Sequence, residues 1–146
     1  MPFEILAVVT NEGKARIAEA IATGKSFKVD HFALTSKGHL ESDPTIAKTP
    51  DPAQTTCDPD DAPPSFYDAI DSYSYTGTFC PEFTCTVSEN EAVGRISSLC
   101  LIGTIVYSPT PGDPEIGVTF LFAVANMPLW IKTDLDSRDW KVTIHF

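Results

Sequence analysis

Basic residues are scarce in this chain of 146 residues. It contains 10 Lys and Arg against 20 Asp and Glu, which gives a formal net charge of −10 at pH 7. Such a surface repels the phosphate backbone of nucleic acids and the headgroups of anionic lipids. No basic patch with interleaved aromatic residues offsets this repulsion. We therefore expect the protein to bind neither nucleic acid nor a membrane surface.

Long hydrophobic runs are also missing. No run approaches the roughly 20 apolar residues that a membrane-spanning helix needs. The segment Met1–Val9 has no basic region, and Glu4 interrupts its apolar run, so we expect no signal peptide. Synthesis in a reducing cytoplasm follows as the default. There the four cysteines are expected to stay thiols rather than to form a disulfide framework.

Catalytic motifs are absent as well. The sequence has no G-x-S-x-G nucleophile elbow and no glycine-rich phosphate loop. His31, His39 and His145 permit a triad with Ser and Asp on paper, but no Ser or Cys stands in a nucleophile context. We predict that the protein is not an enzyme and uses no cofactor.

Two weak metal-binding patterns have simpler explanations. Cys80 and Cys85 are five residues apart, which puts them on opposite faces of a regular strand and opposes joint coordination of zinc. The carboxylates of Asp58, Asp60 and Asp61 lack the spacing and the glycine of a calcium-binding loop. We expect buried thiols and a solvated acidic run, and no metal site.

The length and the 42% hydrophobic content indicate one domain over residues 1–146, large enough to bury roughly 70% of its unfolded surface. Residues 3–9 are predicted to form a strand. Thr10 is predicted to cap a short helix that ends at Gly24, with Ile17 and Ile21 on its apolar stripe. Residues 27–34 are the next predicted strand.

Residues 37–71 differ from the rest of the chain. They hold six of the twelve prolines, eight acidic residues and two lysines, and they show no hydrophobic periodicity. We interpret them as a long surface excursion. It is either an arm that orders against a neighbouring protein or, the favoured alternative, a solvated acidic loop.

The remaining sequence has β-type patterns. Residues 72–88 alternate, which predicts a buried face that starts at Tyr73 and Tyr75 and an edge or break at Pro81. Residues 93–107 are apolar on both faces, as in a central strand, and the turn at 108–114 predicts a hairpin with the strand that follows. Residues 140–146 alternate again. The predicted fold class is α+β and mainly β: a mostly antiparallel sheet or sandwich with one short N-terminal helix and a long acidic, proline-rich loop.

One apolar cluster follows a predicted strand instead of lying inside one. It consists of Met127, Pro128, Leu129 and Trp130. Such a cluster is either a core plug or an interface anchor. Its position at a sheet end favours a partner interface.

Two segments carry a resemblance to a known family. Val9–Gly24 is a short helix that runs into a glycine and a strand, and residues 117–128 read Gly-x-x-Phe-x-Phe-Ala-Val-Ala-Asn-x-Pro. In this order they resemble the N-terminal module of phage tail-collar and tail-fibre proteins. The resemblance extends over about residues 3–34 and 93–146. It implies structural roles for Gly13, Ile17, Ala18 and Gly24.

In that family the module docks a tail fibre to the baseplate. The resemblance therefore implies a structural virion protein of a phage tail, made in the host cytoplasm, that works as an adaptor between baseplate and fibre. Its partners would be other tail or baseplate proteins and a tail fibre, and a homo-oligomer is compatible with this role. Because the resemblance ends with the chain at Phe146, we expect a stand-alone connector without a fibre shaft.

A binding module for surface carbohydrate is the alternative. A soluble β-sandwich of that kind presents aromatic side chains in a groove. Tyr67, Tyr73 and Tyr75, near the edge of the long loop, are the candidates.

Overall fold

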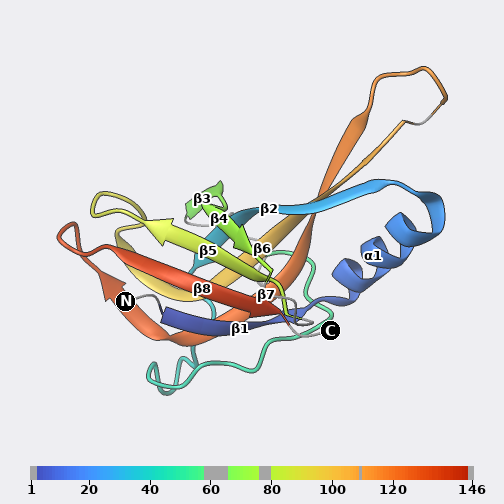
Figure 1. Cartoon of the computed structure of the whole chain (residues 1–146). Helices are drawn as coiled ribbons and strands as arrows, with labels where there is room; N and C mark the ends of the chain where they lie inside the picture. Colours follow the sequence, from blue (N-terminus) through green and yellow to red (C-terminus); the bar gives the residue numbers. More distant parts are fainter. Residues whose placement is uncertain (1–2, 58–65, 76–79, 109, 145–146) are drawn as a thin grey trace.

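A computed structural model describes residues 3–57, 66–75, 80–108 and 110–144 (Figure 1). Within these ranges it contains one helix and eight strands: β1 (Phe3–Val9), α1 (Asn11–Thr23), β2 (Ser26–Thr35), β3 (Phe66–Ala69), β4 (Ser72–Ser74), β5 (Glu82–Val87), β6 (Gly94–Tyr107), β7 (Ile116–Lys132) and β8 (Arg138–Ile144). The strands form one curled sheet in the order β3-β2-β6-β7-β1-β8-β5-β4. The predicted mainly-β class with an N-terminal helix is confirmed, as a single sheet rather than a sandwich.

The two ends of the sheet are joined by the chain itself. Ile70 and Asp71 connect the edge strands β3 and β4. The Ile70 N–H donates to the Asp30 carbonyl on β2 at 3.0 Å, and the Asp71 N–H donates to the Thr84 carbonyl on β5 at 2.9 Å. Because Ile70 is buried, this crossing, which we call the seam, closes the sheet around its core.

The core lies inside the curl. Aromatic and branched side chains from most strands are almost fully buried there, among them Phe32, Leu34, Leu99, Leu101, Ile105, Phe122, Trp140, Val142 and Ile144. Burial of one such side chain contributes about 1.5–3 kcal/mol. A second, smaller apolar cluster lies on the outer face of β2, β6 and β7 and consists of Ala33, Cys100, Ile102, Leu121 and Val124.

Helix α1 is fixed to the sheet at its first turn. The Thr10 side chain accepts a hydrogen bond from the Gly13 N–H at 2.9 Å, and Gly24 ends the helix with a φ of 71°. Both predicted caps are confirmed. The helix packs on the core through Ile17 and Ala20, which turns Ile21 outwards, where it is 80% exposed. The predicted pairing of Ile17 with Ile21 on one buried stripe is therefore wrong.

Over its described part, the segment that follows β2 contains no named strand or helix and is largely exposed or half-buried, but hydrogen bonds hold it to the rest of the fold. Residues 36–57 lie against the outer face of the sheet. The Asn11 N–H donates to the Pro52 carbonyl at 2.7 Å, the Asn126 side-chain amide donates to the Lys48 carbonyl at 3.2 Å, and Cys57 packs on the outer cluster. Residues 58–65, including Asp58, Asp60 and Asp61, lie outside the described residues, and residues 66–69 are strand β3.

The strand predictions hold in outline. Residues 94–107 and 116–132 pair as the predicted hairpin, which projects beyond the body of the sheet (Figure 1). Strands β4 and β5 fall on either side of Pro81, as the proline predicted. On β5, Phe83, Cys85 and Val87 are buried as expected. Tyr73 and Tyr75 are exposed, however, because β4 forms one edge of the sheet and lies outside the closed core.

Gly13 is required where the helix meets β7. A Cβ atom at this position would lie 2.5 Å from the Phe122 carbonyl oxygen. We predict that Gly13→Ala lowers the free energy of unfolding by about 1–3 kcal/mol despite the better helix propensity of alanine, as measured by urea denaturation.

Gly117→Ala is the control for this prediction. Its Cβ would meet only the Thr104 methyl group, at 3.3 Å, and the expected change is within about 1 kcal/mol. Equal effects of the two substitutions would show that the contact between helix and strand is not tight.

Candidate functional site

The four predicted interface residues lie inside a strand and not after one. β7 continues to Lys132, so the predicted position of the cluster beyond a strand is wrong. The residues still differ from a regular strand, because β7 has two more residues than β6 between the pairs Ser98↔Asn126 and Ile96↔Trp130. In this irregular stretch the Leu129 N–H donates to the Pro44 carbonyl at 2.8 Å instead of to β6.

The cluster divides between core and surface. Met127 is buried, Pro128 is exposed, and Leu129 and Trp130 are half-buried. Trp130 packs edge-on against the buried Trp140, with ring centroids 6.0 Å apart. Met127 is therefore part of the core, while the next three residues reach the surface.

A cation–π stack extends this cluster. The guanidinium carbon of Arg138 lies 3.6 Å from the ring centroid of Trp130 and 3.7 Å from that of Phe3. Burial lowers the pKa of Arg138, and the nearby Asp136 opposes this shift. Phe3 is 49% exposed. We call Phe3, Pro128, Leu129, Trp130 and Arg138 the sheet-end cluster; its aromatic and arginine content is typical of protein–protein interfaces.

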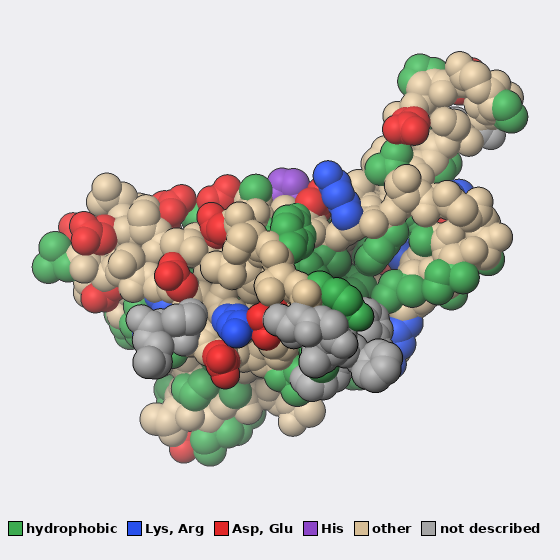
Figure 2. Space-filling model, viewed as in Figure 1, with side chains coloured by type: hydrophobic (Ala, Val, Ile, Leu, Met, Phe, Trp, Pro, Cys, Tyr) green, Lys and Arg blue, Asp and Glu red, His purple; other side chains and the backbone are tan. Residues whose placement is uncertain are grey.

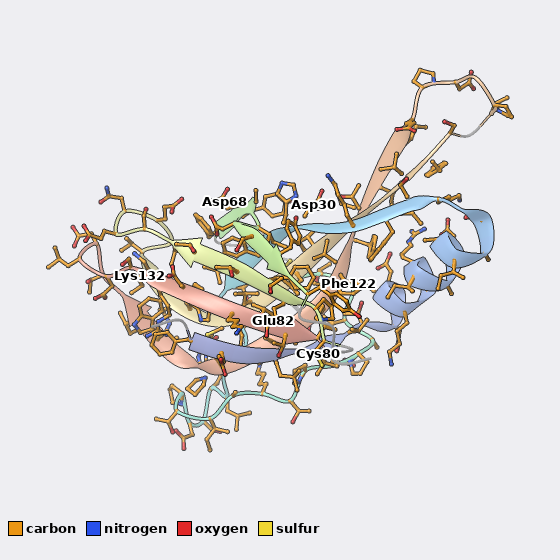
Figure 3. The ribbon with its side chains drawn as sticks, in the orientation of Figure 1. Asp30, Asp68, Cys80, Glu82, Phe122 and Lys132 are labelled. Atoms are coloured by element: carbon orange, nitrogen blue, oxygen red, sulfur yellow. The ribbon has the colours of Figure 1, made fainter. Side chains whose placement is uncertain are left out.

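Two of the three tyrosines of the carbohydrate alternative, Tyr67 and Tyr73, lie on the strands β3 and β4 that the seam joins, and Tyr75 follows β4. Tyr67, Tyr73 and Tyr75 are 48%, 58% and 71% exposed. The ring of His31 stacks on Tyr67 at 4.9 Å and nearly parallel. Partial burial and then the charge of Asp30 raise the pKa of both Tyr67 and Tyr73, which places these two tyrosines near one carboxylate. Figure 3 shows Asp30 beside Asp68 at this edge of the sheet.

The sequence analysis missed a pocket that gathers basic residues. It has a volume of about 270 Å³ and is lined by Ser36, Lys37, His39, Glu41, Pro44, Lys48 and Arg95. We call it the cationic pocket. Three of the chain's ten Lys and Arg residues line it, together with one carboxylate. On the face shown in Figure 2, by contrast, acidic side chains outnumber basic ones.

Ser97 of β6 positions the segment that carries His39, one of the residues that line the cationic pocket. Its Oγ accepts a hydrogen bond from the Gly38 N–H at 2.8 Å and lies 2.8 Å from Nδ1 of His39. Ser97 thus contacts both the backbone at Gly38 and the ring of His39. Burial of His39, followed by the charges of Arg95 and Lys48, lowers its pKa.

The other side chains considered in the sequence differ in burial. Cys85 is fully buried, and this burial raises the pKa of its thiol, whereas Cys80 is half-buried before β5. His145 lies outside the described residues. Within the described ranges, no group of three or more His, Cys, Asp and Glu side chains could hold a metal ion. Among the described residues, no helix is long and apolar enough to span a membrane.

Comparison with known proteins does not identify a family. No family model, no curated protein and no solved structure matches the chain. The resemblance to the tail-collar module therefore stays a prediction.

The lowered pKa of His39 predicts a pH dependence of stability. Below the pKa of about 6.5 of an unfolded histidine, the unfolded chain takes up a proton more readily than the folded protein. The contribution of neutral His39 is thus complete above that pH and is lost as the pH falls through it. Between pH 7.5 and pH 5.5, urea denaturation should show a larger loss of stability for the wild type than for His39→Gln. Equal losses would mean that His39 protonates freely in the folded state.

Proposed function

We propose that this protein is a structural component of a phage tail, an adaptor that attaches a tail fibre or spike to the baseplate and has no catalytic role. The observation that carries the proposal is the packing of the two segments in which the resemblance lies. They are about a hundred residues apart in the sequence, yet they form one unit in the fold. If both segments belong to one module, they must pack against each other in the fold. Two segments that resemble the family only by chance need not be in contact.

The contacts of this unit are specific. The Thr10 N–H donates to the Phe122 carbonyl at 2.9 Å, and the Thr10 hydroxyl donates to the Leu121 carbonyl at 2.7 Å. Gly13 lies directly against Phe122, which Figure 3 shows beside α1. Val8 of β1 pairs with Val124 of β7. The residue types at the start of the helix therefore match those of the Phe-x-Phe-Ala-Val run that they contact.

The sheet-end cluster is the surface we assign to the partner. Phe3 adds exposed aromatic area, and the half-buried Arg138 a cation, to Pro128, Leu129 and Trp130. Leu129 is also held by the Pro44 carbonyl and Trp130 by Trp140, so the cluster is ordered before binding. A preorganised anchor loses less conformational entropy when it binds.

A carbohydrate-binding module is the second candidate. The exposure of Tyr67, Tyr73 and Tyr75, with carboxylates such as Asp30 near the first two, favours it. Aromatic rings and nearby polar groups are the surface that a sugar ring needs. This candidate uses the seam, whereas the adaptor proposal uses the sheet-end cluster.

The adaptor proposal predicts a stable complex with a tail protein. Size exclusion with light scattering would give the mass of the purified protein alone and mixed with the tail, baseplate and fibre proteins encoded beside it. A complex should form, and a double variant with Phe3→Ser and Pro128→Ser should bind at least about tenfold more weakly, because aromatic anchors dominate interface energies.

The control is Ile21→Ser, which removes an exposed apolar side chain from α1 at the far end of the molecule (Figure 1). It should leave the complex intact. A protein that ignores all these neighbours would contradict the adaptor proposal. Saturable glycan binding that is lost in Tyr67→Ala and Tyr75→Ala would then support the carbohydrate candidate.

A further inference from the structure

We propose that the cationic pocket binds a small hydroxylated anion, a molecule of monosaccharide size that carries a carboxylate or a phosphate group. This site is separate from the sheet-end cluster and does not depend on the adaptor role.

The charges around the pocket carry the first part of the argument. Lys37, Lys48 and Arg95 line it, and Glu41 is the one lining carboxylate. In the described part of the chain, neither Lys48 nor Arg95 forms an ion pair, although the protein as a whole has twice as many acidic as basic residues. Elsewhere in the same chain, Arg16, Lys25 and Lys141 do pair with carboxylates. Two cations that converge on one cavity without a carboxylate partner are suited to an external anion.

The walls of the pocket are preformed. Gly38 passes so close to β6 that a Cβ atom would lie 1.9 Å from the Ser97 carbonyl oxygen. The Lys48 N–H donates to the Gly38 carbonyl at 2.8 Å, and the Leu40 N–H donates to the Ile46 carbonyl at 2.9 Å, so residues 38–48 form a closed loop. This loop is anchored to β7 through Pro44 and Lys48. The basic side chains therefore start from fixed backbone positions, which lowers the entropic cost of binding.

His39 adds an uncharged polar group to the charges. Its Nδ1 lies 2.8 Å from Ser97 Oγ, and burial keeps the imidazole neutral, with one N–H group and one acceptor nitrogen. A neutral imidazole next to cations can form a hydrogen bond with a sugar hydroxyl in either tautomer, because a hydroxyl both donates and accepts. The Ser36 hydroxyl lines the same pocket and can do so too.

The size of the pocket narrows the ligand class. Its volume of about 270 Å³ is at the lower end of small-molecule sites and larger than an inorganic phosphate needs. Pro44 is the one apolar side chain among the lining residues, so an apolar ligand would lack partners. A charged sugar matches both the volume and the polarity.

The test is an NMR titration of the full chain with glucuronate, glucose 6-phosphate, inorganic phosphate and glucose, followed through the ring signals of His39. We expect saturable shifts with at least one of the two charged sugars. Inorganic phosphate should bind more weakly and glucose should have no effect. A bound anion should also raise the pKa of His39, which a structural role of the pocket would not do.

A matched pair of double variants separates the pocket from overall charge. Lys48→Gln with Arg95→Gln removes two pocket cations, and affinity should fall at least about tenfold. Lys14→Gln with Lys28→Gln removes two exposed lysines elsewhere and should change affinity by less than about twofold. Arg95→Gln alone, at an exposed position, serves if the first pair impairs folding.

Three outcomes would overturn the proposal. The first is the absence of saturable shifts with both charged sugars at about 10 mM. The second is equal weakening by the two double variants, which would mean that only the net charge matters. The third is equal affinity for inorganic phosphate and for the sugar anions, which would leave no role for the hydroxylated part of the ligand.

Discussion

The fold depends on the contact between the start of α1 and the backbone of β7. One side chain, Thr10, caps the helix through Gly13 and at the same time donates to the Leu121 carbonyl, so a local capping bond and a long-range anchor share one hydroxyl group. The absence of a side chain at Gly13 lets the helix approach Phe122. The junction positions β1 between β7 and β8. Next to it, the Asn11 N–H donates a hydrogen bond to the Pro52 carbonyl and so holds residues 36–57 to the start of the helix. If this junction were looser, β1, α1 and residues 36–57 would all be less firmly positioned on the sheet.

The features predicted correctly from the sequence are those that local chemistry decides. Thr10, Gly24 and Pro81 act within a few residues of themselves, and the helix caps and the strand break appear where these residues stand. The errors share a different cause. Whether Ile21 or Tyr73 is buried depends on the angle of the helix and on which strand forms the edge of the sheet, and both are set by contacts between distant segments. The extension of β7 through Met127–Trp130 was missed for the same reason, because a carbonyl from residue 44 satisfies the backbone there.

The cationic pocket illustrates the limit of composition arguments. The net charge of −10 indicates how the molecule as a whole interacts with a polyanion at long range. Within a Debye length of about 8 Å, however, the local arrangement of charges decides. Lys37, Lys48 and Arg95 are spread over almost sixty positions, and no spacing motif links them. The one local sequence signal for the pocket is Gly38, whose lack of a side chain lets the loop cross β6 at Ser97. A single glycine after a strand is too common, however, to identify a binding site.

The position of β1 has a consequence for the way the protein is made. Of the described strands, β1 leaves the ribosome before the others, whereas both of its neighbours in the sheet, β7 and β8, come after all the others. Its parallel pairing with β8, in which Phe3 faces Trp140 and Ala7 faces Ile144, cannot form until the ribosome has passed Ile144. Until then the apolar faces of β2 and β6 lack part of their cover, and sequence-distant pairing of this kind is slow. The nascent chain is therefore exposed to aggregation between the synthesis of β1 and that of β8, and its yield in a cell should depend on chaperones and on the rate of translation.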